Sequence, residues 1–257
     1  MRRALCEQIP EKPGQSVEIP ENEARHLISV LRLHEGNEIE LLDGSGYRTI
    51  GTLWHQGKRL MAKASHAPES DPALLSKPVH LAMALLKNEA MEWVIEKSVE
   101  LGVKTFTPVE TEFCVIRMNK KGSGAFQERY QKIADQALKQ CGRLERMTVL
   151  EPVTFEEFLK SGPPLFWLDE SLARSAPEQA SLPRRIESLK KDAECALLVG
   201  PEGGFSPAEK ERLQKLSSLT APQNREINRV HLGAVILRAE TAALFGVSLL
   251  AGNCFRS

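Results

Sequence analysis

The sequence lacks several features that define large classes of proteins. Its 34 Lys and Arg residues balance 34 Asp and Glu residues, so it has no basic surplus of the kind that nucleic-acid-binding proteins usually carry. No apolar run approaches the length of a membrane span, and the stretch MRRALCEQIP does not predict a signal peptide. The five cysteines form no CxxC or other metal-like spacing. This predicts reduced thiols in a cytoplasmic protein, with no metal site and no membrane segment.

The common nucleotide-binding and catalytic motifs are missing as well. The segment GPEGG at residues 200–204 is not followed by Gly-Lys-Ser or Gly-Lys-Thr, which excludes a P-loop. It does not match GxGxxG either, so the sequence gives little support to nicotinamide chemistry. No Ser-His-Asp, Cys-His or paired-carboxylate arrangement is recognisable. Any chemistry must therefore come from another kind of site.

Two glycine-containing turns near the C-terminus are the most informative part of the chain. The apolar run Ala196–Val199 predicts a buried parallel strand, and the glycines of residues 200–204 would let a ligand approach the backbone closely. Ser206, Pro207 and Glu209 then predict the N-cap, the first residue and the capping-box glutamate of a helix. A strand, a bare loop and a capped helix together form a ligand site at the strand ends of an open α/β sheet.

The second turn repeats this plan. A short segment at Val230–Leu232 leads to Gly233, and an apolar helix is expected to begin near Leu237 or Arg238. Its apolar residues follow helical spacing. Arg238 and Glu240 would lie in the first turn, where charged residues in an otherwise apolar helix need an explanation.

The rest of the chain predicts two domains. Residues 1–70 contain short strand patterns and one short helix predicted over Glu21–Leu33, which favours a small closed or half-closed β-barrel. Residues 71–78 are polar and marked by prolines, as expected of a linker. In residues 79–257 strands alternate with helices, which predicts an α/β domain with a mainly parallel sheet. The clearest predicted elements are strands at Glu38–Leu42, Tyr47–Trp54, Arg59–Ala64, Val79–Leu86, Thr105–Val109 and Pro164–Leu168, and helices at Met91–Leu101 and Phe126–Gln140. Thr154 and Glu157 predict a capping box that opens a further short helix.

The two turns also carry a family resemblance. GPEGGFSPAE at residues 200–209, followed by LGAVILRAETA at residues 232–242, closely resembles the paired signature of the RsmE-type 16S rRNA (uridine-N3) methyltransferases of the SPOUT superfamily. HLISVLRLHEGNEIELLDGSG at residues 26–46 resembles the PUA-like N-terminal domain of the same family. The resemblance implies S-adenosylmethionine as cofactor, a trefoil knot in the C-terminal SPOUT-type domain, 16S rRNA or the small ribosomal subunit as partner, and a homodimer.

The same resemblance implies which residues hold the cofactor and the RNA. Arg238 and Glu240 are the implied catalytic residues, and Glu202 is a second candidate for the base. The predicted cofactor-binding residues are Leu168, Leu198, Gly200, Pro201, Glu202, Gly203, Gly204, Leu232, Gly233, Ile236, Leu237, Ala239 and Thr241. The predicted RNA contacts are Arg25, His26, Arg32, Lys120, Lys121 and Arg143. The alternatives are that His26 caps or packs, and that the basic residues between 104 and 146 form a solvated helix face.

Four positions depart from the family pattern. Ala90 stands where the family usually has a basic residue, Phe113 where it often has arginine, Lys139 where it commonly has glutamate, and Val235 where it has arginine. The loss of positive charge bears on RNA binding more than on cofactor binding. Two functions remain: a methyltransferase acting on uridine N3 of small-subunit rRNA, and a non-catalytic RNA-binding relative that keeps the cofactor fold. The intact GPEGG and LRAETA segments favour the first.

Arg238 and Glu240 also have two alternative roles. A guanidinium is always charged and can bind a uracil anion or a phosphate bidentately, and Glu240 could orient it or act as the base. Alternatively, the two side chains form an ion pair that fixes the start of the helix. We favour the catalytic role for Arg238, and for Glu240 the sequence leaves both roles open.

Overall fold

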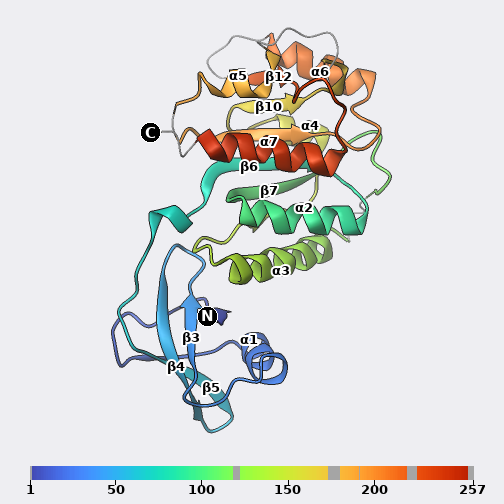
Figure 1. Cartoon of the computed structure of the whole chain (residues 1–257). Coiled ribbons are helices and arrows are strands. Elements are labelled where there is room, and N and C mark those ends of the chain that lie inside the picture. The colour runs from blue at the N-terminus through green and yellow to red at the C-terminus, as the bar shows by residue number, and fades with distance from the viewer. Residues whose placement is uncertain (1, 118–121, 173–179, 191, 219–224, 254–257) are drawn as a thin grey trace. The chain divides into compact units, whose positions relative to one another are not determined.

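The computed structural model describes residues 2–117, 122–172, 180–190, 192–218 and 225–253 (Figure 1). The chain divides into two compact units. The first consists of Met1–Ser76 and Asp135–Arg146, and the second of Lys77–Ala134 and Met147–Ser257. The boundary after Ser76 falls within the predicted linker. No local pattern in the sequence indicates that residues 135–146 belong to the first unit.

A mixed five-stranded sheet is the framework of the first unit. Its strands are Arg3–Leu5 (β1), Ser16–Glu18 (β2), Glu38–Leu42 (β3), Arg48–Gln56 (β4) and Arg59–Ala64 (β5). They follow the order β1-β3-β4-β5-β2, with β1 parallel to β3 and the other neighbours antiparallel. Among the described strands β1 and β2 do not pair with each other, so the sheet is open at that point. The three strands predicted between residues 38 and 64 are confirmed.

The helix expected from Glu21 is confirmed only in part. An α-helix, α1, covers Glu21–Arg25 and continues as a π-helix, η1, at His26–Val30. Arg32 has a φ of 53°, a left-handed conformation that a helix cannot continue through. Leu27 is fully buried in the core on the sheet. The helical pattern read as far as Leu33 is therefore wrong in its last turn.

A nearly buried ion pair joins α1 to the end of helix α3, Ser123–Cys141. Lys139 Nζ lies 2.6 Å from Glu23 Oε1, and the two side chains are 10% and 9% exposed. Arg3 Nη1 donates a hydrogen bond to the carbonyl of Lys139 at 2.8 Å. The lysine at a position where glutamate is common therefore has a carboxylate partner inside the first unit.

We expect Lys139→Ala to lower the free energy of unfolding by about 3 kcal/mol, because it leaves the Glu23 carboxylate almost buried without its cation. Urea unfolding measures this difference. The exposed pair of Arg25 with Glu21, whose side chains are 73% and 90% exposed, supplies the control. Arg25→Ala should change the same free energy by less than about 1 kcal/mol, and equal effects of the two substitutions would contradict the expectation.

A parallel seven-stranded sheet is the framework of the described part of the second unit. Its strands are Lys77–Ala84 (β6), Val103–Glu110 (β7), Thr148–Val149 (β8), Val153–Thr154 (β9), Leu165–Leu168 (β10), Cys195–Val199 (β11) and Ile227–Val230 (β12). They follow the order β12-β10-β11-β6-β7-β8, β9 also pairs with β7, and each of these pairs is parallel. This confirms the predicted α/β class (Figure 1).

Helices cover both faces of this sheet. They include Asn88–Glu100 (α2), Phe155–Leu159 (α4), Leu182–Ile186 (α5), Pro207–Ser217 (α6) and Ala239–Asn253 (α7). A short 3-10 turn lies at Glu170–Leu172 (η3) in this unit, and another lies at Pro72–Leu74 (η2) in the first unit. Leu198 of β11 packs with Phe155 of α4 and Leu213 of α6. Leu197 points to the opposite face. There α7 lies so close that a Cβ added at Gly246 would be 2.6 Å from the Leu197 side chain.

The helix starts follow the sequence signals with one exception. The predicted capping boxes are both present, Thr154 with Glu157 at α4 and Ser206 with Glu209 at α6. The exception is a small offset at the last helix, which is expected to begin near Leu237 or Arg238: α7 begins one residue later, at Ala239, and the Arg238 carbonyl accepts a hydrogen bond from the N–H of Ala242 at 2.8 Å. Leu237 instead lines the cavity described below, so it does not contribute to the helix face, and Arg238 lies in the loop before α7.

Candidate cofactor site

A cavity of about 490 Å³ opens at the carboxyl ends of β10, β11 and β12. Because these strands are parallel neighbours, the segments that follow them meet at one edge of the sheet. Its volume lies within the range of roughly 300–1,000 Å³ that is usual for small-molecule sites. The lining residues are Leu168, Asp169, Glu170, Val199, Gly200, Pro201, Glu202, Gly203, Gly204, His231, Leu232, Gly233, Val235, Ile236, Leu237, Arg238, Ala239 and Ala242.

Glycines bring the backbone of the two turns close to their surroundings. Gly204 has a φ of +70°, and a Cβ added there would lie 2.8 Å from Oε1 of Glu170. Gly233 in the second turn has a φ of +125°, which L side chains rarely adopt. A Cβ added at Gly203 would meet the Cβ of Phe113 at 3.4 Å, which is ordinary contact. Gly204 and Gly233 are therefore the positions where glycine is required by the backbone itself.

Glu209 holds the first turn from the α6 side. Its Oε2 accepts a hydrogen bond from the backbone N–H of Ser206 at 2.9 Å, and its Oε1 accepts one from the backbone N–H of Glu112 at 2.8 Å. The side chain is almost buried, so these bonds satisfy a polar group that would otherwise be costly to bury. The capping-box glutamate thus also fixes the segment that carries Phe113.

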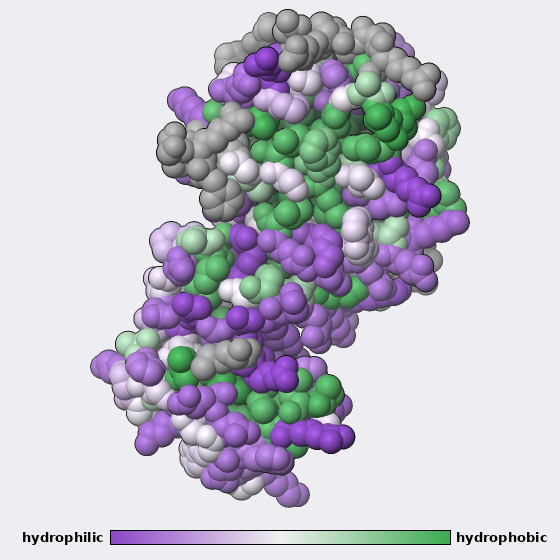
Figure 2. Space-filling model, in the orientation of Figure 1, coloured by the Kyte–Doolittle hydropathy of each residue, from purple (hydrophilic) through white to green (hydrophobic). Residues whose placement is uncertain are grey.

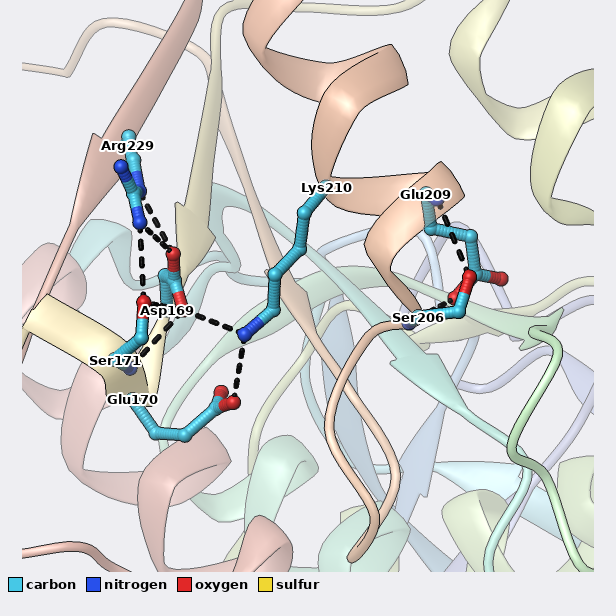
Figure 3. A network of polar contacts seen from close by, with 7 residues as sticks. All are labelled: Asp169, Glu170, Ser171, Ser206, Glu209, Lys210 and Arg229. Atoms are coloured by element: carbon cyan, nitrogen blue, oxygen red, sulfur yellow. Dashed lines mark hydrogen bonds and ion pairs between the residues drawn. The ribbon is translucent and has the colours of Figure 1, made fainter.

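The buried carboxylate of Asp169, which directly follows β10, is paired with side chains from α6 and β12 (Figure 3). The side chain of Asp169 is fully buried and accepts hydrogen bonds from Lys210 Nζ at 3.0 Å, Arg229 Nε at 2.7 Å and the Ser171 hydroxyl at 2.8 Å. Burial by itself would raise the pKa of Asp169, but the hydrogen bonds from Lys210, Ser171 and Arg229 outweigh it and lower the pKa below its ordinary value. Asp169 is therefore an ionised group paired with two cations.

Most of the predicted cofactor residues lie together at this cavity. The residues that line it as predicted are Leu168, Gly200, Pro201, Glu202, Gly203, Gly204, Leu232, Gly233, Ile236, Leu237 and Ala239. Leu198 does not line it, because its side chain is buried in the core on the face of α4 and α6. Thr241 does not line it either, since it is exposed on the first turn of α7.

Sequence reasoning missed two acidic residues of the lining, Asp169 and Glu170. Both directly follow the strand predicted at Pro164–Leu168, so their place at a strand end was a signal available in the sequence. Their partners Lys210 and Arg229 could not be found in this way, because they come from other segments of the chain.

Arg238 and Glu240 occupy different places. Arg238 is exposed and lines the cavity, whereas Glu240 is half-buried in the first turn of α7 and does not line it. No ion pair joins these two described residues, so the structure lacks the helix-end pair of the structural alternative. Glu202, the second candidate for the base, is exposed at the cavity.

The predicted RNA contacts between residues 25 and 32 are accessible. Arg25 and Arg32 are exposed, and His26 is half-buried at the start of η1. Arg25 makes an exposed ion pair with Glu21 at 3.0 Å, which is a weak interaction in water. The geometry leaves these three side chains open to a phosphate.

The remaining predicted RNA contacts differ from this. Lys120 and Lys121 lie outside the described residues. The Arg143 guanidinium donates a hydrogen bond to the carbonyl of Leu75, and burial lowers its pKa. The Arg143 guanidinium is therefore less available to bind an RNA phosphate than the sequence predicts.

Three of the departures from the family pattern have simple surroundings. Val235 is 73% exposed and lines the cavity, and Phe113 is 45% exposed next to Gly203. Ala90 is half-buried near the start of α2. Two exposed apolar side chains therefore lie at or beside the cavity at positions where arginine is common.

The described part of the chain contains neither a membrane-spanning helix nor a metal cluster. None of its helices is long and apolar enough to cross a bilayer. No group of three or more His, Cys, Asp or Glu side chains in it could hold a metal ion. Cys6, Cys114, Cys141 and Cys195 are not joined by disulfide bonds.

The cavity fits S-adenosylmethionine in its chemistry. Glycine turns offer backbone donors and acceptors without side chains in the way, apolar residues such as Leu168 and Ile236 suit an adenine ring, and Glu170 offers an acceptor. When bound, the cofactor supplies an electrophilic methyl group on a positively charged sulfur. Arg238 and Glu202, two of the predicted catalytic candidates, are among the charged residues that line this cavity.

Comparisons with known proteins agree with this geometry. A family model described as an RNA methyltransferase domain matches residues 74–251, and one described as an RNA methyltransferase PUA domain matches residues 19–53. The chain is 28% identical over 246 residues to ribosomal RNA small subunit methyltransferase E of Bacillus subtilis, covering 95% of this chain and 92% of that protein.

Solved structures resemble the fold along nearly its whole length. Ribosomal RNA small subunit methyltransferase E of Neisseria gonorrhoeae, bound to S-adenosyl methionine, superposes with a TM-score of 0.78 at 27% identity, over 98% of this chain and 97% of that one. A methyltransferase of Legionella pneumophila in complex with the same cofactor gives a TM-score of 0.78 at 26% identity, over 98% and 96%.

The family model for the catalytic domain spans well over half of the chain and includes every segment that lines the cavity. The chain therefore belongs to the RNA methyltransferase family, and it is an S-adenosylmethionine-dependent RNA methyltransferase.

Proposed function

We propose that this enzyme transfers a methyl group from S-adenosylmethionine to N3 of a uridine in 16S rRNA of the small ribosomal subunit. The observation that carries the proposal is the cavity at the carboxyl ends of β10, β11 and β12, where the GPEGG and LRAETA turns meet and Arg238 faces the ligand space. Relatives named ribosomal RNA small subunit methyltransferase E along almost the full length of the chain support the choice of RNA.

Arg238 is the residue best placed to assist the chemistry. Uridine N3 carries a proton and becomes a good nucleophile only once that proton has left. An exposed guanidinium at the cavity can stabilise the negative charge that develops on the uracil ring. Glu202 is the acidic candidate for proton removal on the cavity wall, and Glu240 acts at most from the side of α7.

The alternative of a non-catalytic RNA-binding relative has weaker support. It would require the substrate side of the cavity to be lost, yet Arg238 is present there and accessible. The apolar residues Phe113 and Val235 change the chemistry of the cavity surroundings without closing them. Exposed basic residues of the first unit, Arg25 and Arg32, are proposed to help hold the RNA.

The enzyme is further proposed to be a cytoplasmic homodimer with a trefoil knot in its second unit. Figure 2 shows apolar residues gathered on the face of this unit where α7 lies in front. Phe245 of α7 is 43% exposed and Ile236 is 61% exposed, an arrangement that a second copy could cover. Sedimentation of the purified protein tests the dimer, and a mass of a single chain would contradict it.

Loss of the gene tests the function directly. Small-subunit rRNA from a strain without it should contain a uridine that lacks a methyl group, and purified enzyme with S-adenosylmethionine should restore the missing mass. Mass analysis of RNA digests measures both. An RNA whose methylation is the same with and without the gene would remove the proposed function.

Gly204→Ala should weaken the binding of S-adenosylmethionine about tenfold, because the left-handed conformation costs an alanine at least about 1 kcal/mol and its Cβ displaces Glu170. Isothermal calorimetry measures the affinity. Gly57→Ala is the matched control, since Gly57 has a similar φ of +66° but lies between β4 and β5 of the first unit and does not line the cavity, and the affinity of this variant should stay within about twofold. The reverse order of the two effects would contradict the assignment of the turn.

Arg238→Lys should separate chemistry from architecture. If the planar guanidinium stabilises the uracil anion, the variant keeps its melting temperature and cofactor affinity but loses about 100-fold or more in the rate of methyl transfer. Single-turnover rates at saturating cofactor, measured beside thermal unfolding, report the two quantities. A variant that loses stability and cofactor affinity together, and still turns over normally once bound, would show that Arg238 is structural.

A further inference from the structure

Glu170 differs from the other acidic residues at the cavity in how it is held. Its Oε1 accepts a hydrogen bond from Lys210 Nζ at 2.8 Å, and the same Nζ donates to Asp169 Oδ1 at 3.0 Å (Figure 3). Asp169 is fully buried, Lys210 is 21% exposed and Glu170 is 42% exposed. Asp169, Lys210 and Glu170 therefore form a chain of ion pairs that leads from the protein interior to the wall of the cavity.

Asp169 anchors this arrangement in the interior. Its second oxygen, Oδ2, is paired with Arg229 of β12, and Ser171 donates to its first oxygen. Burial tends to lower the pKa of Lys210, but its hydrogen bonds to Glu170 and Asp169 raise the pKa above the ordinary value. Lys210 therefore stays charged. If its side chain moved away from Asp169, the buried carboxylate would lose one of its two cationic partners, which is energetically costly.

The position of Glu170 is further fixed by the glycine turn. The 2.8 Å between its Oε1 and a Cβ added at Gly204 means that the carboxylate lies against the bare backbone of that turn. Its other oxygen, Oε2, accepts no hydrogen bond from the described residues. The carboxylate therefore lines the cofactor cavity with one oxygen engaged and one available.

We propose that Glu170 is a cofactor-binding residue that accepts a hydrogen bond from a donor group of S-adenosylmethionine, and that Lys210 is the positioning residue that orients it. Two donors of the cofactor have this chemistry, the ribose hydroxyls and the ammonium of its amino-acid end. A carboxylate binds either strongly, since hydrogen bonds to an ionised acceptor are the stronger ones. The inference rests on cofactor binding and is independent of which RNA is the acceptor.

Glu170→Gln tests the contact by calorimetry with three ligands. S-adenosylmethionine and its demethylated product carry both donors, whereas 5′-methylthioadenosine keeps the ribose and lacks the ammonium. The variant should bind the first two about tenfold more weakly than the wild type does. A similar loss for 5′-methylthioadenosine supports the ribose contact, and an unchanged affinity for it supports the ammonium contact. Unchanged affinity for all three ligands, or a loss confined to S-adenosylmethionine, would overturn the proposal.

Lys210→Met tests the positioning role. It should weaken cofactor binding about as much as Glu170→Gln does, and the double variant should be no weaker than either single one, because both act on the same contact. Lys210→Arg, which keeps a cation, should recover most of the affinity. Lys215→Met is the control, since Lys215 is exposed on the same helix. A Lys210→Met protein with a lower melting temperature and wild-type cofactor affinity would reduce Lys210 to a structural role.

Binding of the cofactor and the role of Glu170 can be refuted separately by these experiments. A wild-type protein that gives no heat with S-adenosylmethionine would refute the cofactor itself. A wild-type protein that binds it normally while Glu170→Gln binds it equally well would refute only the role of Glu170.

Discussion

The site depends on the parallel pairing of β12, β10 and β11. Parallel strands end at the same edge of a sheet, so the segments that follow them must share one space. Helices bury both faces of the sheet and so hold the three strands in place. The neighbouring residues Leu197 and Leu198 of β11 pack against helices on opposite faces. The cavity is therefore a consequence of topology before any side chain within it is considered.

Two buried or nearly buried carboxylates turn this topology into a rigid site. Glu209 satisfies the backbone at the start of α6 and also holds the segment of Glu112. Asp169 is paired with cations from α6 and from β12. Such groups are costly to bury alone and stable only when all their partners are in place. They act between segments that are far apart in the sequence, and this makes the cavity walls depend on one another.

The sequence predicted local structure well wherever a signal acts over a few residues. The capping boxes at Thr154 and Ser206 are confirmed because the cap, the backbone N–H groups and the glutamate are neighbours along the chain. The last helix, expected to begin near Leu237 or Arg238, begins at Ala239, because Leu237 has helical spacing but lines the cavity. Residues 135–146 belong to the first unit through contacts such as Lys139 with Glu23, which no local pattern reveals.

The α/β class, the glycine turns and most of the residues that line the cavity could be predicted from the sequence, because the turn positions that need glycine are fixed by backbone sterics and by the motif around them. The folded chain was needed to learn that Leu198 and Thr241 lie away from the cavity, that Asp169 and Glu170 line it, and that Lys210 and Arg229 reach the same carboxylate. Burial and ion pairing depend on distances in space, and these distances are set by how separate strands pair.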